Sequence, residues 1–126
     1  MVNVEIVTLG AGSEVGRSCF QITIGDVTVL VDAGVHLKPQ TDVDRLPVLP
    51  GRPIAAAIIT HYHLDHIGAL PYLTEVSGEL TCREILLSVP TKTLSPSLLV
   101  DYCKANQIYC PNHIWACFDK VRCFGM

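Results

Sequence analysis

The feature that most constrains the fold is an apolar segment that runs directly into a cluster of polar, metal-binding residue types. Residues 54–59 are six consecutive apolar residues between Pro53 and Thr60, which is typical of a strand covered on both faces in a layered fold. Three histidines and one aspartate follow within residues 61–66. Such groups beside a buried strand are costly to keep unless they bind something. The sequence therefore predicts a layered fold with a binding site at the end of this strand.

The other predicted elements agree with a layered fold. Four further strands are expected, over residues 4–9, 19–24, 27–31 and 85–88, with Gly25 and Asp26 as a two-residue hairpin turn between the second and third. Residues 36–53 read as a loop, and helices are expected at 68–76, 91–104 and 112–122. Ser95 and Pro96 fit either the N-cap of the middle helix or a kink in a helix that begins at Thr91. This order favours an α/β or α+β fold over a barrel or bundle, without choosing between the two.

Composition limits the chain to one domain and excludes several classes of protein. The chain has 126 residues, of which 49% are apolar and only 17% charged, against about 25% charged in ordinary soluble domains. The longest apolar run is too short for a membrane span. The nine basic residues are scattered and the net charge is −3, so the chain has no nucleic-acid footprint of its own. The apolar excess indicates a part of something larger, or a chain with a large interface.

The N-terminus lacks a basic region and an export signal, so we expect the six cysteines to be reduced thiols in a cytosolic or nuclear setting. Cys110, His113, Cys117 and Cys123 are a second possible zinc site, but their spacing is looser than that of usual zinc modules. Cysteines 103, 110 and 117 recur every seven residues, and the apolar residues around Cys117 follow helical spacing. Buried helix positions are therefore the favoured interpretation.

The histidine cluster predicts a metal centre. His61 and His63 are two residues apart at a strand end, which is expected to point both imidazoles to one face, and Asp65 and His66 follow in the next turn. This donor set suits Zn²⁺, with Fe or Mn as possibilities. Because one ion cannot comfortably take all four ligands, we predict two adjacent ions, with His61 and His63 on the first and Asp65 and His66 on the second. The alternative is a solvated, histidine-rich turn.

Two other segments are candidate neighbours of this centre. Asp32 ends the strand 27–31, where its carboxylate would orient a ligating histidine, or would simply begin a turn. The glycine-rich residues 10–16 lack the following helix that a dinucleotide site needs, so we expect a tight loop that brings Glu14, Arg17 or Ser18 close to the metal edge. His36 and His113 are expected to be ordinary polar residues.

The His-x-His-x-Asp-His motif at residues 61–66, with Asp32 upstream, resembles the metallo-β-lactamase superfamily. Residues 9–19 and 66–72 resemble its β-CASP RNA nucleases, which include the endonuclease subunit of the cleavage and polyadenylation specificity factor and the catalytic subunit of Integrator. Residues 32–36, 90–92 and 98–102 continue the resemblance.

The resemblance implies an α/β fold, the αββα sandwich, of which residues 1–126 would be the N-terminal part without a β-CASP domain. It implies that His61 and His63 hold one zinc ion, that Asp65 and His66 hold another, and that Asp32 and Asp65 are catalytic. The implied reaction is attack of a metal-activated hydroxide on an RNA phosphodiester in mRNA or small nuclear RNA 3′-end processing. The implied partners are RNA, a paralogous subunit and a nuclear processing complex, with no membrane.

In the family that the chain resembles, a further histidine, a bridging aspartate and cap-domain residues lie downstream of position 126. We therefore expect an incomplete ligand set and an isolated chain that does not cut RNA, so that its status as an enzyme stays open. Two alternatives remain. One is a non-catalytic scaffold or degenerate copy of the same fold, and the other is a hydrolase of the same superfamily that acts on a thioester or lactam.

Overall fold

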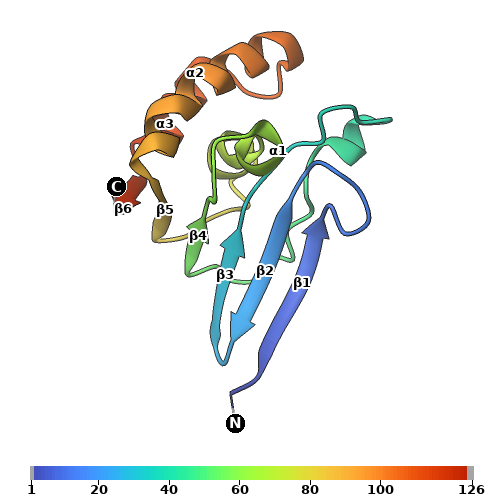
Figure 1. The fold of residues 1–126 in the computed structure, drawn as a ribbon, viewed down its shortest axis with the longest axis vertical. Coiled ribbons are helices and arrows are strands. Elements are labelled where there is room, and N and C mark those ends of the chain that lie inside the picture. The colour runs from blue at the N-terminus through green and yellow to red at the C-terminus, as the bar shows by residue number, and fades with distance from the viewer. Residues whose placement is uncertain (1, 125–126) are drawn as a thin grey trace.

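A computed structural model of the chain describes residues 2–124. One six-stranded sheet runs through it in the order β1-β2-β3-β4-β5-β6 (Figure 1). The strands are β1 (Val4–Gly10), β2 (Cys19–Ile24), β3 (Val27–Val31), β4 (Ala56–Ile58), β5 (Glu84–Ser88) and β6 (Val121–Phe124). The first three pair antiparallel, and β3 to β6 pair parallel to one another. The Gly25 turn is a two-residue hairpin as predicted, because Ile24 pairs with Val27.

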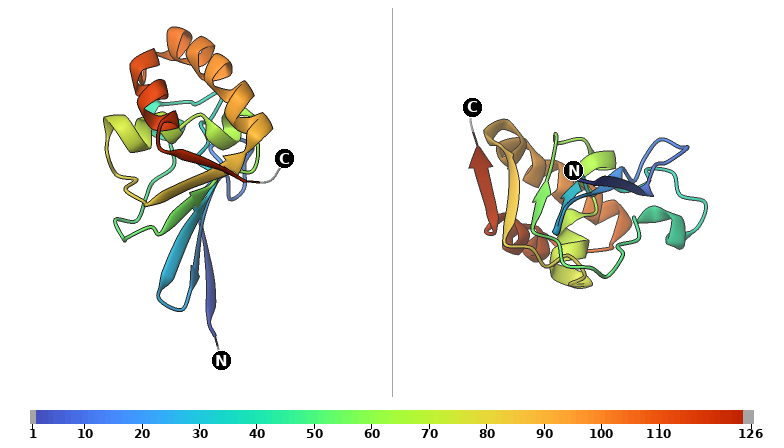
Figure 2. Two further views of the ribbon diagram at one scale, coloured as in Figure 1. Left: turned by 90° about the vertical axis from the view of Figure 1, so that its left-hand side faces the viewer. Right: turned by 90° about the horizontal axis from the view of Figure 1, so that it is seen from below.

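All helical segments except the first lie together on one side of the sheet, the first lies apart near the end of β1, and the β1–β3 ribbon extends beyond the helices (Figures 1 and 2). They are η1 (Asp42–Arg45), α1 (Leu64–Ile67), the π-helix η2 (Tyr72–Val76), α2 (Val89–Asn106) and α3 (Pro111–Phe118). In β5, Ile85 and Leu87 are buried, while Glu84, Leu86 and Ser88, which alternate with them, are half-buried. This alternation shows that the helices cover one face of the sheet. No helix among residues 2–124 has the length and apolar character needed to cross a membrane.

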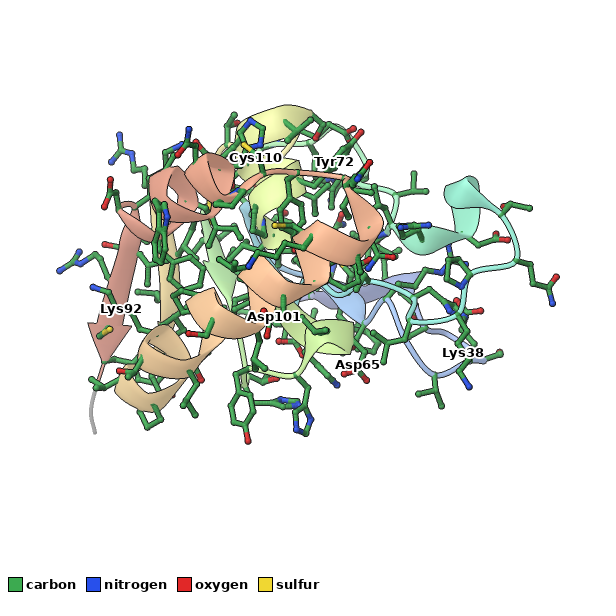
Figure 3. All side chains as sticks on the ribbon, turned by 90° about the horizontal axis from the view of Figure 1, so that it is seen from above. Lys38, Asp65, Tyr72, Lys92, Asp101 and Cys110 are labelled. Atoms are coloured by element: carbon green, nitrogen blue, oxygen red, sulfur yellow. The ribbon has the colours of Figure 1, made fainter. Side chains whose placement is uncertain are left out.

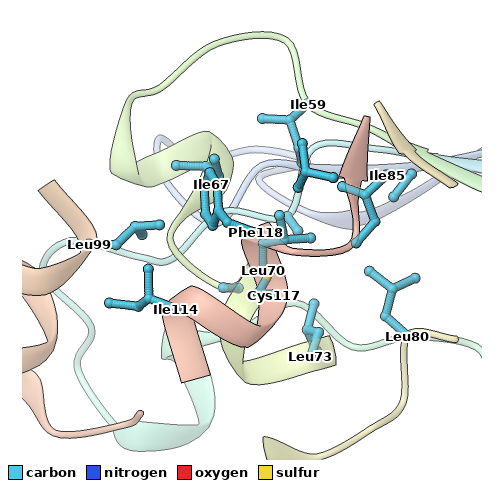
Figure 4. Close-up of a cluster of buried hydrophobic side chains, with 14 of the residues drawn as sticks. Ile59, Ile67, Leu70, Leu73, Leu80, Ile85, Leu99, Ile114, Cys117 and Phe118 are labelled. Carbon is cyan, nitrogen blue, oxygen red and sulfur yellow. The ribbon is translucent and has the colours of Figure 1, made fainter. Parts of the chain in front are cut away.

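The core lies between this covered face and the helices (Figure 4). Tyr109 closes one side of it, because its hydroxyl donates to the carbonyl of Gly68 at 2.7 Å and thereby ties the α2–α3 connection to the segment after α1. The other central side chains are fully or almost fully buried: Ile59, Ile67, Leu70, Leu73, Ile85, Leu99, Ile114 and Cys117. Aliphatic burial of this kind supplies the main stabilisation, about 25 cal/mol per Å² of apolar surface.

The predicted last helix, 112–122, was wrong at its C-terminal end. α3 ends at Phe118, and β6 then pairs in parallel with β5. Val121, which fits the helical stripe, is still buried in the core, so its spacing matched two different structures. The β-branched and aromatic residues of Val121–Phe124 suit a strand once the edge of β5 is available.

Two other boundaries also differ from the predictions. The helix expected at 68–76 is preceded by α1, so that Asp65 and His66 lie in a helical turn and not in a loop before it. α2 begins at Val89 with Ser88 as N-cap, and Pro96 lies inside it, so Ser95-Pro96 does not cap a helix. Local spacing indicated the helices, but their starting points depend on contacts made by the preceding strands.

Candidate metal centre

Asp32 sits at the end of β3 in a strained backbone conformation. Its φ is 65°, in the left-handed region that costs about 1–2 kcal/mol for most residues and is more readily visited by aspartate. Its N–H donates to the carbonyl of Ile58 at 2.8 Å, and its side chain is only 5% exposed. The turn therefore directs a buried carboxylate across the end of β4.

The Asp32 carboxylate is satisfied by two residues of the loop that follows β4. Thr60 donates its N–H to Oδ1 at 2.8 Å and its hydroxyl to Oδ2 at 2.9 Å. His66 Nδ1 lies 2.7 Å from Oδ2. A buried carboxylate that collects several donors holds each of them in position. The predicted proximity of Asp32 to the cluster is therefore present in the structure.

The backbone of the same segment is held from the other side by main-chain donors. Three consecutive carbonyls each accept one N–H from a different point in the chain, which fixes the first turn of α1 against β3 and the glycine-rich loop. The pairs are Val35 N to Leu64 O at 3.1 Å, Ser18 N to Asp65 O at 2.9 Å and Ala33 N to His66 O at 2.9 Å.

Gly34 makes this close approach possible. A Cβ atom added at Gly34 would lie 1.7 Å from the carbonyl oxygen of Asp65, far inside any van der Waals contact. The N–H of Gly34 donates to Ser18 O at 2.9 Å. The position therefore requires glycine for space, and the positions of Asp65 and His66 depend on it.

We call residues 60–66 the histidine loop. The three imidazoles of this segment lie close together. The ring centroids of His61 and His66 are 4.1 Å apart, and those of His61 and His63 are 4.8 Å apart. Because β4 ends at Ile58, the loop and not strand alternation brings His61 and His63 together. Burial, together with the neighbouring imidazoles of His66 and His63, lowers the pKa of His61. The neutral form, which is the metal-binding form, is favoured there.

The hydrogen bonds leave the outer nitrogen of two histidines free to bind an ion. Thr60 Oγ1 gives its only proton to Asp32, so it accepts from His61 Nδ1 at 2.8 Å. His66 Nδ1 donates to Asp32. In the neutral form of each ring the lone pair then lies on Nε2. His66 Nε2 lies 3.5 Å from Asp65 Oδ2. The donor chemistry fits a metal such as zinc, although no three His, Cys, Asp or Glu side chains within residues 2–124 surround one point as a metal group does.

The second candidate zinc site does not come together. Cys117 is fully buried in α3, whereas Cys123 lies exposed on β6, and Cys110 and His113 pair only with each other at 3.4 Å. The seven-residue spacing is not that of one helix, because Cys103 lies in α2 and the chain leaves helical structure before α3. Figure 3 shows Cys110 well separated from Asp65.

The glycine-rich loop reaches the histidine loop through its backbone. β2 follows it as the predicted strand, so the helix required for a dinucleotide site is missing. Arg17 is held by Glu14, with Nε to Oε1 at 2.6 Å, and Glu14 Oε2 lies 3.9 Å from His36 Nε2. Only Ser18 of the three predicted neighbours bonds directly to the histidine loop, through its N–H.

Sequence reasoning missed two residues on which this geometry depends. Thr60 was treated as a boundary, yet it joins Asp32 to His61. Gly34, to which the sequence pattern assigns no role, permits the backbone contact with Asp65. A threonine directly after a buried strand, level with an aspartate that ends the neighbouring strand, was the only local signal for the first.

The strained Asp32 at the end of β3 is thus joined to a turn that carries three imidazoles. Residues 12–96 match the family model described as the metallo-beta-lactamase superfamily. The chain belongs to this superfamily. Its mixed sheet with few helices is consistent with a partial metallo-β-lactamase fold, which confirms the predicted α/β class.

Similar proteins narrow the resemblance to factors of RNA processing. The chain is 37% identical over 133 aligned positions to cleavage and polyadenylation specificity factor subunit 3-II of Arabidopsis thaliana, covering 94% of this chain and 21% of that protein. It is 40% identical to the Integrator complex subunit 11 homolog of Dictyostelium discoideum, over 82% of this chain and 14% of that protein. It is 35% identical to endoribonuclease ysh1 of Schizosaccharomyces pombe, over 94% of this chain and 16% of that protein. The chain thus spans about a fifth of these relatives or less.

Proposed function

We propose that this chain is the N-terminal, metal-binding part of a zinc-dependent RNA endonuclease of mRNA or small nuclear RNA 3′-end processing. In this proposal residues 1–126 are the N-terminal part of a metallo-β-lactamase domain. The observation that carries it is the 2.7 Å contact between the buried Asp32 carboxylate and His66 Nδ1. The RNA substrate is carried over from relatives named as an endoribonuclease and as cleavage and polyadenylation factors.

The metal would be held by His61 and His63 on one side and by Asp65 and His66 on the other. A bound zinc pair supplies Lewis acidity and a hydroxide at neutral pH. The chain's own contribution is positional: Asp32 fixes the His66 ring, and Thr60 fixes the His61 ring. Asp65 reaches the same centre because its backbone is clamped by Ser18.

We infer that the isolated chain binds metal weakly and does not cut RNA, because four donors without further ligands leave a two-ion centre incomplete. RNA, a paralogous subunit and a nuclear processing complex would be partners of the complete protein, which places the function in the nucleus. The exposed positions of the histidine loop fit a surface that meets further protein.

Zinc titration of the purified chain against a competing chelator tests this proposal. We expect less than two equivalents of zinc, weakly held, and a loss of that binding in His63→Ala. His113→Ala, which removes a histidine outside the loop, is the matched control and should bind as the unsubstituted chain does. Unchanged zinc binding by His63→Ala would refute the metal site, and two tightly held ions per chain would refute the incomplete ligand set.

A non-catalytic scaffold is the second candidate. It is favoured by the lack, within residues 2–124, of three ligand side chains arranged around one ion. The scaffold predicts that zinc does not bind even at high concentration and that His63→Ala retains the stability of the chain. Cleavage of a small ester or thioester while RNA remains intact would instead favour another hydrolase of the superfamily.

A further inference from the structure

Within the part of the chain that the structure describes, no hydrogen bond holds the ring of His63. The other two imidazoles of the histidine loop differ from it in this respect. Thr60 bonds to the ring of His61, and Asp32 bonds to the ring of His66. His63 is also the exposed member of the three, whereas the others are half-buried. The orientation of the His63 ring therefore depends on a different kind of contact.

The backbone of His63 is fixed, but its backbone bonds do not fix its side chain. His63 is the N-cap of α1, where its carbonyl accepts the N–H of His66 at 2.9 Å and the N–H of Ile67 at 3.0 Å. These bonds leave rotation about the side-chain bonds of His63 possible. A ligand that rotates freely loses conformational entropy when it binds an ion, which lowers its affinity. A contact that already restricts the ring would therefore strengthen metal binding.

Two aromatic rings make this contact with His63. The centroid of the Tyr62 ring lies 5.1 Å from that of His63, with 75° between the ring planes. The centroid of the His61 ring lies 4.8 Å from it, with 78° between the planes. Both pairs have the edge-to-face geometry that aromatic rings prefer at centroid distances of about 4.5–7 Å. Because His61 is itself a predicted ligand, Tyr62 is the contact that comes from outside the ligand set.

We propose that Tyr62 is a positioning residue for the metal centre, because its ring packs edge to face against His63 and holds that imidazole in the orientation in which it binds zinc. This inference rests on the proposed function, since it takes His63 as a ligand. Tyr62 has the role for this ring that Thr60 and Asp32 have for the other two, with an aromatic contact in place of a hydrogen bond. The role requires the aromatic ring of Tyr62 and not its hydroxyl.

Zinc titration of three variants of the full 126-residue chain against a competing chelator tests the proposal. Tyr62→Leu removes the aromatic ring but keeps an apolar side chain, and its zinc affinity should fall about 2- to 12-fold, the range that an aromatic pair supplies. Tyr62→Phe keeps the ring and should bind zinc as the unsubstituted chain does. Tyr72→Leu is the matched control and should not change the affinity, because Tyr72 is also half-buried but lies well apart from Asp65 (Figure 3).

Nuclear magnetic resonance of the metal-free chain tests the ring contact separately from zinc binding. Overhauser effects between the ring protons of Tyr62 and His63 are expected in the unsubstituted chain, since the two centroids are 5.1 Å apart. The carbon-bound ring protons of His63 should change their chemical shifts in Tyr62→Leu and much less in Tyr62→Phe, because only the first variant removes the ring current. The Overhauser measurement needs no substitution, so it decides the contact even if Tyr62→Leu does not fold.

Circular dichroism establishes that each variant is folded. If folded Tyr62→Leu binds zinc as tightly as the unsubstituted chain, the positioning role is overturned, while the metal site itself stands as long as His63→Ala abolishes binding. A loss of affinity that Tyr62→Phe shares also overturns the role, because the hydroxyl would then be responsible. The absence of Overhauser effects between Tyr62 and His63 overturns it as well. An unsubstituted chain that binds no zinc refutes the proposed metal site and the positioning role together.

Discussion

The histidine loop and the cysteine segment, residues 103–123, carry similar metal-binding residue types, yet the fold treats them in opposite ways. In the histidine loop, hydrogen bonds orient two of the imidazoles at the end of the sheet: Thr60 bonds to His61, and Asp32 bonds to His66. In the cysteine segment, Cys117 is buried in the core, and this burial raises the pKa of its thiol to about 12. The difference shows that metal-binding residue types become a site only where buried polar groups orient them, because an unoriented thiol in a helix is simply a small apolar side chain.

The largest effect is expected from Gly34→Ala. The added Cβ would meet the Asp65 carbonyl, so β3 and α1 must separate, and we expect a loss of about 4 kcal/mol or more in the free energy of unfolding. Gly25→Ala is the control, since its φ is 59° but nothing lies near the added atom, and it should cost about 1–2 kcal/mol. Urea denaturation measures both, and equal losses would refute the proposed close packing of the histidine loop.

Asp32→Asn should have an intermediate effect on stability and a marked one on metal binding. The amide keeps the size of the side chain but cannot accept from both Thr60 and His66 as the carboxylate does, which should cost about 2 kcal/mol. Zinc affinity should fall about 10–100-fold because the His66 ring is no longer oriented. Asp101→Asn, on the exposed surface of α2, should change neither quantity. Chelator competition and urea denaturation measure the two effects, and undiminished zinc affinity would contradict the role of Asp32.

The smallest effect concerns the buried thiols at high pH. The pKa of Cys19 is raised to about 12, mainly by burial and in addition by the Asp32 carboxylate, and that of Cys117 is also raised to about 12. An unfolded thiol ionises near 9, so stability is intact below pH 9 and falls as pH rises from there towards 12. We expect about 1 kcal/mol lost per thiol at pH 10.

Urea midpoints at pH 8 and pH 10 measure this loss. Cys117→Ala should reduce the difference between the two values, whereas Cys110→Ala should leave it unchanged because Cys110 is exposed. A pH dependence that is the same in both variants would show that the cysteine segment is not buried as described.

Sequence reasoning found most of the sheet but not its last strand. Patterns within six or seven residues located β2, β3 and the turn between them, because strand alternation and the Gly25-Asp26 turn are local properties. Val121 satisfied a helical stripe and a strand equally well. Only the exposed edge of β5 decided between them. For the candidate site, the residue types and the neighbouring strand end were recognisable, but the connection through Thr60 required the register of β3 against β4.

By itself, the sequence determined which groups are present and in what order: an apolar strand, a donor-rich turn and an aspartate at the end of an earlier strand. Tertiary structure decided that Asp32 meets His66 across 34 residues of chain and that Gly34 lies against Asp65. The physical reason is the sequence separation over which each kind of interaction acts. Backbone propensities and turn preferences act over a few residues, whereas a buried hydrogen bond or a packed face gains free energy only after distant segments have been brought together.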